Sequence, residues 1–352
     1  MKKIFFIFFI TLLFSVSSMA QTDKDTVKYK TDDVIITGTR TEKKLIDIPY
    51  PVDLIEKEDF RYSRNMGIND VLGTTPGLFM QSRYGNHDVR ISIRGFGSRS
   101  NTGIRGVRIL LDGIPESEPD GQTRIEAIDF NALGSIEVVR GNASALYTNA
   151  PGGVINFIND IKFYKPFAWS FNEIGEFGMR KNTIKAGVAT NSLRFMTSFT
   201  YTNYNGYRDH SNEYQKIVNS VLEAEVGRNS NLSVLTNFVS GAIRLPGSLN
   251  LTQYNENPLQ ANATDKSRDA KRDSKKGRLA VRFNNTFGKS LNNVIEGTGY
   301  LTVKDFDRTA KTYRLFSRYG IGGSLRYVNK SEIAGRDNEF SDRRNGHNRR
   351  HD

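Results

Sequence analysis

Three short β-prone runs of the sequence end on a charged residue that is followed directly by glycine. The pairs are Arg94-Gly95, Asp112-Gly113 and Arg140-Gly141. Glycine at such a position permits a tight turn or a close approach of backbones, and the residue before it places a fixed charge at the strand end. A buried arginine needs a carboxylate partner, because an unpaired charge is costly to bury. If Arg94 and Arg140 are buried, each therefore needs such a partner.

The residue types that carry catalysis form no recognisable arrangement. The chain of 352 residues has no Cys, which excludes disulfides, thiolate metal sites and Cys nucleophiles. The four His residues are scattered, and only His347 and His351 have a spacing that would suit a metal; both lie in a polar tail that we expect to be solvated. No Ser/His/Asp, carboxylate-pair or phosphate-loop pattern occurs above chance. We expect no enzyme activity, no metal and no cofactor.

The chain is basic, with a net charge of +12. Such a charge favours contact with nucleic acid or with a membrane surface. No basic helix, nucleic-acid fold motif or block of Lys and Arg is present, so we expect no nucleic acid among the partners.

Residues 1–20 have the pattern of a secretory signal peptide. Two lysines precede an apolar run at 4–16, and the small residues Ser18 and Ala20 predict cleavage after Ala20. The run is shorter than the roughly 20 residues that a membrane-spanning helix needs. The pattern predicts an exported protein whose mature part has no transmembrane helix.

The first half of the chain alternates short apolar runs with turn residues, which is typical of short strands. Predicted strands cover residues 51–55, 78–80, 89–93, 107–111, 136–139 and 154–158. Predicted short helices cover residues 58–63, 66–72 and 143–147. Polar loops are expected at residues 81–88, 101–106 and 117–124.

From residue 167 onward, apolar and polar residues alternate. Leu193, Phe195 and Phe199 fall on one face of a strand whose other face carries Arg194 and Ser198. An apolar face and a charged face in segments of about ten residues are typical of transmembrane β-barrels. We expect about eight antiparallel strands, near residues 167–177, 181–190, 193–203, 213–226, 231–242, 278–287, 293–304 and 319–328.

The predicted connections alternate in length from the third strand on. Long loops are expected at residues 205–212, 243–277 and 305–318, and short turns at 227–230, 288–292 and 329–331. A soluble β-sandwich would show the same alternation along its strands. Long loops at one end and short turns at the other favour the barrel. Residues 337–352 are expected to be a polar run without a strand.

The motifs of the first half resemble the plug domain of TonB-dependent outer-membrane receptors. They are Ile93-Arg94-Gly95, Leu111-Asp112-Gly113, IEVVRG at 136–141, SALY at 144–147 and GGVIN at 152–156. The resemblance implies a mainly β protein, with an N-terminal α+β plug followed by antiparallel strands of a transmembrane barrel. It divides the chain into a signal peptide at 1–20, a flexible arm at 21–40, a plug at 41–160 and barrel strands at 161–352.

The resemblance also implies three groups of functional residues. The TonB box corresponds to Val34, Ile35, Ile36, Thr37 and Gly38. A short extended segment with β-branched residues can add to the sheet edge of a partner; the alternative is that it forms the first strand of the plug. Arg94 and Arg140 correspond to arginines that pair with glutamates of the barrel strands and so lock the plug inside the barrel. The candidate ligand contacts in plug loops are Arg83, Tyr84, Gln122 and Arg124.

Plugged outer-membrane transporters use about 22 strands, so about eight predict a partial barrel from a longer receptor. A complete small barrel is the poorer alternative, because about eight strands enclose only their own side chains. The resemblance implies TonB-powered uptake of a ferric chelate by a monomer in the outer membrane of a Gram-negative bacterium, among lipid and lipopolysaccharide. The alternatives are an inactive truncated remnant, or a receptor for a vitamin, another metal or a glycan.

An anionic chelate of the citrate or carboxylate-siderophore kind is the expected cargo. PDGQT at 119–123, LPGSL at 245–249 and NPLQA at 257–261 resemble regions of ferric-citrate-type receptors. Residues 243–278 carry eight cations, Arg244, Lys266, Arg268, Lys271, Arg272, Lys275, Lys276 and Arg278, against four acids. Excess positive charge on an outer loop would speed capture of an anion. The alternative is a solvated surface that faces lipopolysaccharide phosphates.

Overall fold

The computed structural model describes residues 35–36, 43–44, 48, 50–62, 64–85, 88–98, 103–116, 123–144, 147, 149–333 and 336–351. The predicted signal peptide at 1–20 lies outside these residues. So do Val34, Thr37 and Gly38 of the predicted TonB box, and the candidate ligand contact Gln122.

A five-stranded sheet forms the centre of the plug, in the order β3-β8-β9-β6-β7. Its members are β3 (Val52–Glu56), β8 (Leu133–Arg140), β9 (Gly153–Asn159), β6 (Val107–Leu111) and β7 (Ile114–Pro115). Only β6 and β9 pair in parallel; the other neighbours are antiparallel. The predicted strands at 51–55, 107–111, 136–139 and 154–158 all lie in this sheet, so these predictions are confirmed.

Two short helices and a hairpin surround the sheet. The helices are α2 (Lys57–Phe60) and α3 (Ile68–Leu72), followed by a single 3-10 turn, η2 (Phe130–Ala132). The hairpin pairs β4 (Leu78–Tyr84) with β5 (Asp88–Ile93). The prediction of a polar loop at 81–88 is therefore mostly wrong, because backbone pairing carries β4 through polar residues as far as Tyr84.

The predicted helix at 143–147 is not formed by the described residues there. One backbone bond of 2.8 Å joins Tyr147 N to Ala143 O. The backbone N–H groups of Ala143 and Ser144 bond elsewhere, to Ala150 O and to the side chain of Asn142. An Asn side chain that accepts from the N–H two residues further on has the arrangement of a helix N-cap, so these contacts close a single turn and no regular helix is assigned to the described residues.

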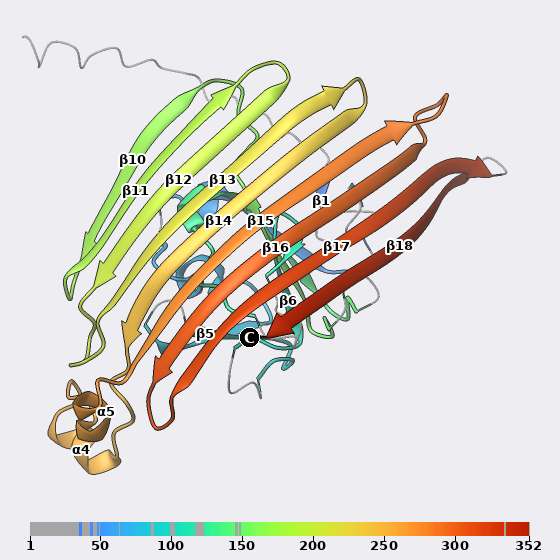
Figure 1. The fold of residues 1–352 in the computed structure, drawn as a ribbon. Coiled ribbons are helices and arrows are strands. Elements are labelled where there is room, and N and C mark those ends of the chain that lie inside the picture. Colours follow the sequence, from blue (N-terminus) through green and yellow to red (C-terminus); the bar gives the residue numbers. More distant parts are fainter. Residues whose placement is uncertain are drawn as a thin grey trace, which may run out of the picture. The chain divides into compact units, whose positions relative to one another are not determined.

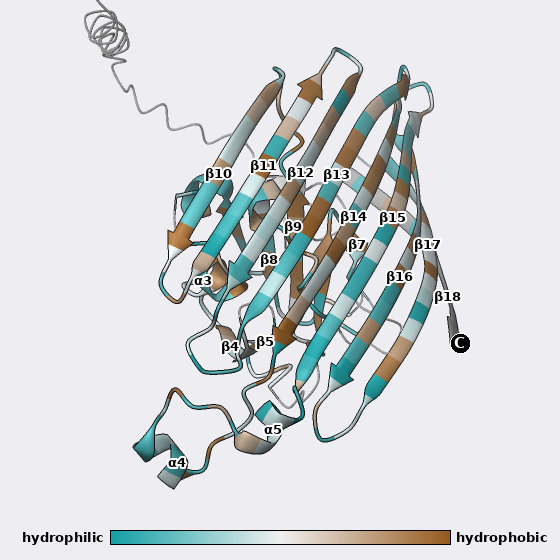
Figure 2. Ribbon diagram, turned by 60° about the vertical axis from the view of Figure 1, so that its left-hand side comes forward, coloured by the Kyte–Doolittle hydropathy of each residue, from teal (hydrophilic) through white to brown (hydrophobic). Residues whose placement is uncertain are grey.

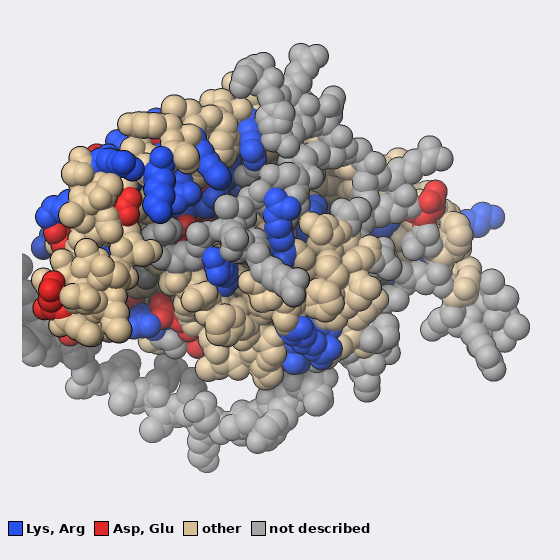
Figure 3. All heavy atoms as spheres, turned by 90° about the horizontal axis from the view of Figure 1, so that it is seen from below, with Lys and Arg blue, Asp and Glu red and all other residues tan. Residues whose placement is uncertain are grey.

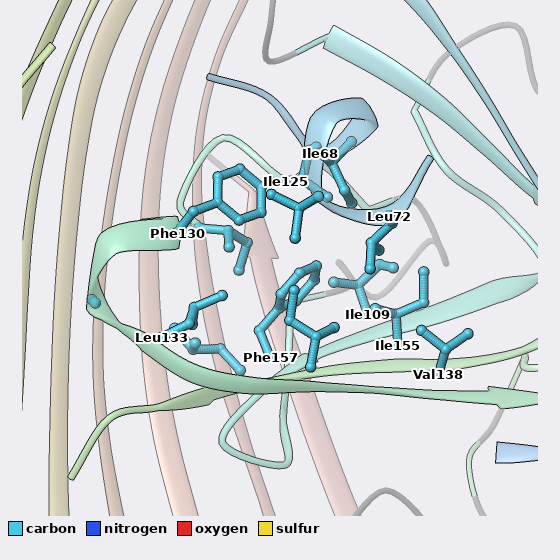
Figure 4. Close-up of a cluster of buried hydrophobic side chains, with 14 of the residues drawn as sticks. Ile68, Leu72, Ile109, Ile125, Phe130, Leu133, Val138, Ile155 and Phe157 are labelled. Carbon is cyan, nitrogen blue, oxygen red and sulfur yellow. The ribbon is translucent and has the colours of Figure 1, made fainter. Parts of the chain in front are cut away.

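The plug core draws on all of these elements (Figure 4). Ile68 and Leu72 of α3 face Ile109 of β6 and Phe157 of β9, and all four are 0% exposed. The Phe157 ring meets Phe130 edge to face, with centroids 6.3 Å apart. Each Å² of apolar surface that is buried contributes about 25 cal/mol to stability, so this cluster is a large source of the stability of the plug.

Nine antiparallel strands form the second sheet, here called the wall, and each pairs with its neighbour in the chain (Figure 1). They are β10 (Phe167–Gly175), β11 (Met179–Ala189), β12 (Leu193–Tyr204), β13 (Glu213–Gly227), β14 (Ser230–Arg244), β15 (Lys271–Phe287), β16 (Asn293–Thr309), β17 (Arg314–Ile333) and β18 (Arg336–His351). In the described part of the chain this sheet is open, with β10 and β18 as its edges. The predicted fold class is confirmed.

The wall departs from prediction at its polar segments. The run expected to lack structure at 337–352 forms β18, which pairs with β17 from Ile333↔Arg336 to Arg318↔His351. His347 and His351 thus lie on a strand. The long loop expected at 305–318 shrinks to residues 310–313, and β15 begins seven residues earlier than the predicted 278. Backbone pairing, unlike the apolar alternation used for prediction, does not depend on side-chain polarity.

Alternation along the wall strands is confirmed (Figure 2). On β12, Met196, Ser198 and Thr200 are buried toward the plug, whereas Phe195 and Phe199 are exposed on the opposite face. The outward apolar face is the surface that lipid covers in barrels. No helix of the described residues is long and apolar enough to cross a membrane.

Candidate functional site

The charged residue–glycine pairs make two tight hairpin turns. Asp112 and Gly113 both have positive φ, 49° and 74°, in the two-residue turn between β6 and β7. Arg94 and Gly95, with φ of 49° and 87°, make the corresponding turn after β5. Two successive positive φ angles are the requirement of the commonest hairpin turn, and glycine accepts them without strain. The turn prediction is confirmed at both pairs.

A plug carboxylate, Glu116, pairs with two cations of the wall. Its side chain is 1% exposed and contacts Lys276 Nζ and Arg278 Nη1, both on β15. Arg278 also donates to the carbonyl oxygen of Pro115 over 3.0 Å. Removing one partner of a buried pair commonly costs about 3–5 kcal/mol, because a charge is left uncompensated. The Glu116 cluster therefore fixes β7 against β15.

A second cluster surrounds Glu126, nearer to the end of the wall that carries the long loops. Glu126 lies 3.3 Å from Lys304 Nζ and 3.9 Å from Arg272 Nη2, and it accepts a 2.9 Å bond from Ser274 Oγ. Arg272 Nη1 is also 2.7 Å from Asp88 Oδ2. Two plug carboxylates thus share wall cations from β15 and β16.

Both glutamates stay ionised in the fold. Burial by itself raises the pKa of Glu116, but Arg278 and Lys276 outweigh it and hold that pKa below its usual range. Burial likewise opposes ionisation of Glu126, and Lys304, Arg272 and Arg124 lower its pKa overall. Burial raises the pKa of Asp112, and bonds from Asn159 offset this only in part. The wall cations therefore decide the charge state of the two plug glutamates.

The first strands of the wall hold the plug in a similar manner. Lys185 of β11 is 1% exposed at its side chain and lies 3.1 Å from Asp160, which also contacts Lys57 of α2. Lys181 donates to the side chain of Asn65 over 2.6 Å. Plug acceptors and wall cations thus meet at both β11 and β15.

The predicted arginine lock has a different environment in the structure. Arg140 pairs with Asp53 inside the plug, at 2.8 Å, and donates to the carbonyl oxygen of Pro76 over 3.2 Å. Arg94 is exposed and has no ion-pair partner among the described residues. In the part of the wall that is described, the plug is held with the opposite polarity, by plug acids on wall cations.

One corner of the plug contains the backbone of two candidate ligand contacts, Arg83 and Tyr84, and the side chain of a third, Arg124. Arg83 and Tyr84 end β4, and Tyr84 pairs across the hairpin with Asp88. Asp88 lies 3.6 Å from Arg124, whose guanidinium also stacks 5.1 Å from the Phe306 ring centre. Arg124 therefore belongs to the Glu126 cluster, with only 19% of its side chain exposed.

The described part of the predicted TonB box is a short extended hairpin. Ile35 and Ile36 form β1 (Ile35–Ile36), which pairs with β2 (Lys43–Lys44) in a two-stranded sheet of its own. This pair is separate from the five-stranded plug sheet. The extended backbone suits strand addition, while the role in energy coupling stays a prediction.

The structure corrects the cation count of the outer loop. The loop runs over residues 245–270, with α4 (Leu251–Glu256) and α5 (Ala263–Ser267), and contains two cations, Lys266 and Arg268, against three acids. The other six cations counted there lie on β14 and β15. Figure 3 looks at the end where α4 and α5 lie and shows Lys and Arg gathered on this face. The positive charge thus belongs to the wall.

Sequence reasoning missed the plug acids and the wall cations that pair with them. On β15, the cations Arg272, Lys276 and Arg278 sit at even positions in the run KRDSKKGR at 271–278, of which all residues but Arg278 fall in the predicted loop at 243–277. Period-two spacing of the cations was the available signal. Among the described residues, no cluster of His, Asp and Glu could hold a metal ion.

Comparison with known proteins agrees with this architecture. Residues 44–154 match the family model described as "TonB-dependent Receptor Plug Domain". A protein of Yersinia pestis named "Hemin receptor" is 28% identical over 137 residues, and one of Yersinia enterocolitica with the same name is 25% identical over 149 residues. These matches span 39% and 42% of this chain but only 19% and 21% of the relatives.

Solved structures share the fold of plug and wall together. The unliganded ferric citrate transporter FecA superimposes with a TM-score of 0.69 at 19% identity, over 86% of this chain and 48% of that chain. The pyoverdine outer-membrane receptor FpvA of Pseudomonas aeruginosa gives 0.69 at 14% identity, over 88% and 48%. The chain therefore spans about half the length of these receptors.

Proposed function

We propose that this chain, which carries a TonB-dependent receptor plug domain at residues 44–154 and folds as the receptors do, serves energised uptake of an iron-carrying ligand across the outer membrane. The observation that carries the proposal is the plug seated against the wall through Glu116 and Glu126. An interface built from ion pairs can separate and re-form if water or an anionic ligand takes the place of each acid beside the wall cations, because a buried cation left without a counter-charge is costly.

The similar proteins are receptors and transporters rather than enzymes, by their descriptions. In the mechanism that we propose, ligand binds at the end of the wall that carries the long loops and contacts the corner of Arg83, Tyr84 and Arg124, with Gln122 nearby in sequence. TonB then adds a strand at the segment Val34 to Gly38 and transmits force to the plug. Arg94 and Arg140 stay proposed as parts of the plug lock. Lipid and lipopolysaccharide surround a monomeric receptor to which this chain contributes the plug and the nine described strands of the wall.

The cargo that we propose bears carboxylates. The relatives named hemin receptors and the fold neighbour named ferric citrate transporter have this ligand chemistry in common, because heme carries two propionates and citrate three carboxylates. An arginine can hold a carboxylate through two parallel hydrogen bonds, which suits Arg83 and Arg124 as contacts.

The test is binding of ferric dicitrate, hemin, a neutral hydroxamate chelate and cobalamin to the receptor in outer-membrane vesicles. We expect submicromolar binding of ferric dicitrate or hemin. Arg83→Gln combined with Arg124→Gln should weaken that binding at least tenfold, since each charged hydrogen bond contributes about 1.5–3 kcal/mol. Lys216→Gln on β13 is the matched control and should leave it unchanged. Tight binding of only the hydroxamate or cobalamin would overturn the cargo.

A further inference from the structure

Strand β15 carries a line of cations on its plug-facing side. Arg272, Lys276, Arg278 and Arg282 all occupy even positions, and successive side chains of a strand alternate between faces. At about 3.4 Å per residue, the ten steps from Arg272 to Arg282 cover roughly 34 Å along the strand. Barrel strands tilt by about 35–45°, so the line crosses most of the roughly 30 Å hydrocarbon layer. Lys304 of β16, opposite Lys276, widens it.

The counter-charges of this cation line come from the plug. Asp88 and Glu126 face Arg272, Glu116 faces Lys276 and Arg278, and the carbonyl oxygen of Asp112 accepts from Arg282. The cross-strand neighbours of the line carry no acid: they are Ile243, Val239, Asn237 and Ser233 on β14, and Arg308, Lys304, Thr302 and Thr298 on β16. Glu223 of β13, two strands away, interacts electrostatically with Arg282 alone among the line.

Any movement of the plug away from β15 separates the plug acids from the wall cations. Glu116 and Glu126 belong to plug segments, so they leave the wall when the plug shifts, whereas the cations stay on β15 and β16. Cations without counter-charge in a narrow lumen are costly, and they attract anions strongly because low-dielectric walls focus the field. The vacated positions fit carboxylates, since Glu116, Glu126 and Asp88 occupy them in the resting state.

We propose that the cation line is the binding track along which a carboxylate-bearing ligand crosses the membrane, on the inner face of the wall, and that Glu116, Glu126 and Asp88 of the plug occupy the track while the plug is seated. The inference rests on the proposed function and deepens it: it assigns the route and the charge of the cargo. It covers the carboxylates of ferric citrate and the propionates of heme alike, and the two ligands form separate arms of the test.

The test is TonB-dependent uptake of radioactive iron by cells, measured separately from binding at the surface. The central variant is Glu116→Gln combined with Lys276→Gln and Arg278→Gln, which removes the charges of the cluster and keeps polar side chains of similar size. We expect surface binding of ferric dicitrate or hemin within twofold of the unsubstituted receptor and uptake per bound ligand about tenfold lower, since charge focusing raises local concentration by at least that factor.

Two control variants separate the track from other effects. Glu116→Gln alone keeps the cations and should retain at least half of the uptake. The second control combines Lys275→Gln with Arg268→Gln. Lys275 is exposed at an odd position of β15, and Arg268 is exposed in the outer loop, so neither belongs to the cation line. This variant should also retain at least half of the uptake.

A second variant guards against misassembly of the triple variant. Arg282→Gln leaves the Glu116 cluster intact, loses a bond to a backbone carbonyl, and should lower uptake at least threefold. Normal uptake in both this variant and the triple variant would overturn the track and leave the receptor assignment standing. If the unsubstituted receptor binds neither ligand, the proposed cargo fails, and the track with it.

Discussion

At the scale of single residues, the arginines of this chain have distinct roles, which depend on the groups that accept their hydrogen bonds. Arg278 faces a buried carboxylate, Arg140 an acid of its own domain, and Arg208 only carbonyl oxygens. The guanidinium of Arg208 donates to Gly247 O at 2.8 Å and to Gln260 O at 2.8 and 3.1 Å. It therefore joins the start of the outer loop to the segment between α4 and α5.

Replacing Arg208 with Gln should loosen this loop. One amide cannot reproduce the fork of donors, and each charged hydrogen bond that is lost costs about 1.5–3 kcal/mol. We expect cleavage within residues 245–270 by a nonspecific protease to become at least tenfold faster. Lys266→Gln is the control, because its pair with Asp209 is exposed at 55% and 52% and such pairs contribute about 0–1 kcal/mol. Equal cleavage rates for the two variants would contradict the clamp.

Acid should loosen the plug through Glu116 and Glu126. Wall cations lower the pKa of both groups from the ordinary value of 4.5, so the unfolded plug binds more protons than the folded plug below that pH. Their contribution is therefore complete above about pH 4.5 and is lost as pH falls further. Asp112, whose pKa burial raises, acts with the opposite sign and favours the fold at low pH.

The measurement is the urea midpoint of plug unfolding in detergent between pH 3 and pH 7, with near-ultraviolet circular dichroism as the signal. We expect the urea concentration at the midpoint to decrease as the pH is lowered below 4.5. In a variant that carries both Glu116→Gln and Glu126→Gln, the midpoint should be lower at pH 7 and less dependent on pH. An unchanged pH dependence in that variant would refute the role of these ion pairs.

At the scale of elements, short strands recur in two different environments. Strands β6 and β9 are buried on both faces of the plug sheet, whereas β1 pairs only with β2. A hairpin whose strands have only two residues each has almost no independent stability. We therefore expect β1 to exchange its partner easily, as strand addition by TonB requires.

Ile36→Pro should uncouple uptake from binding. Proline removes a backbone donor and fixes φ, so neither β2 nor a partner strand can pair normally there. In the intact receptor we expect surface binding of ligand within twofold of normal and uptake at least tenfold lower. Ile36→Val retains both the donor and the branched side chain and should transport normally. Normal uptake by the proline variant would disprove the placement of the TonB box.

At the scale of the whole molecule, the described wall is an open sheet with edges at β10 and β18. Unpaired backbone groups at an edge cannot be satisfied by lipid, and an apolar exposed face promotes association. Residues such as Phe238 and Ile321, which are 54% and 62% exposed, belong to that face. A stable membrane form of this wall thus needs partners for both edges.

Residues 1–352 expressed alone and refolded in detergent should show no change in gel mobility on heating. A closed barrel resists detergent at room temperature and unfolds only when heated, whereas an open sheet lacks that resistance. Electrophoresis of heated and unheated samples makes the comparison, with the ferric citrate transporter FecA as the positive control. A compact band in the unheated sample would show that the edges close on one another.

The sequence by itself determined the elements whose signals are local. β-Branched runs bounded by glycine located the plug strands, the pairs Asp112-Gly113 and Arg94-Gly95 located their turns, and alternation located eight strands of the wall. Only the tertiary structure decided what the polar segments do. Strand β18 and the first half of β15 form because their backbones complete a ladder, which side-chain polarity does not reveal. Glu116 and Lys276 meet across 160 positions of the chain, and the pairing exists because the plug and the wall bury opposite charges against each other.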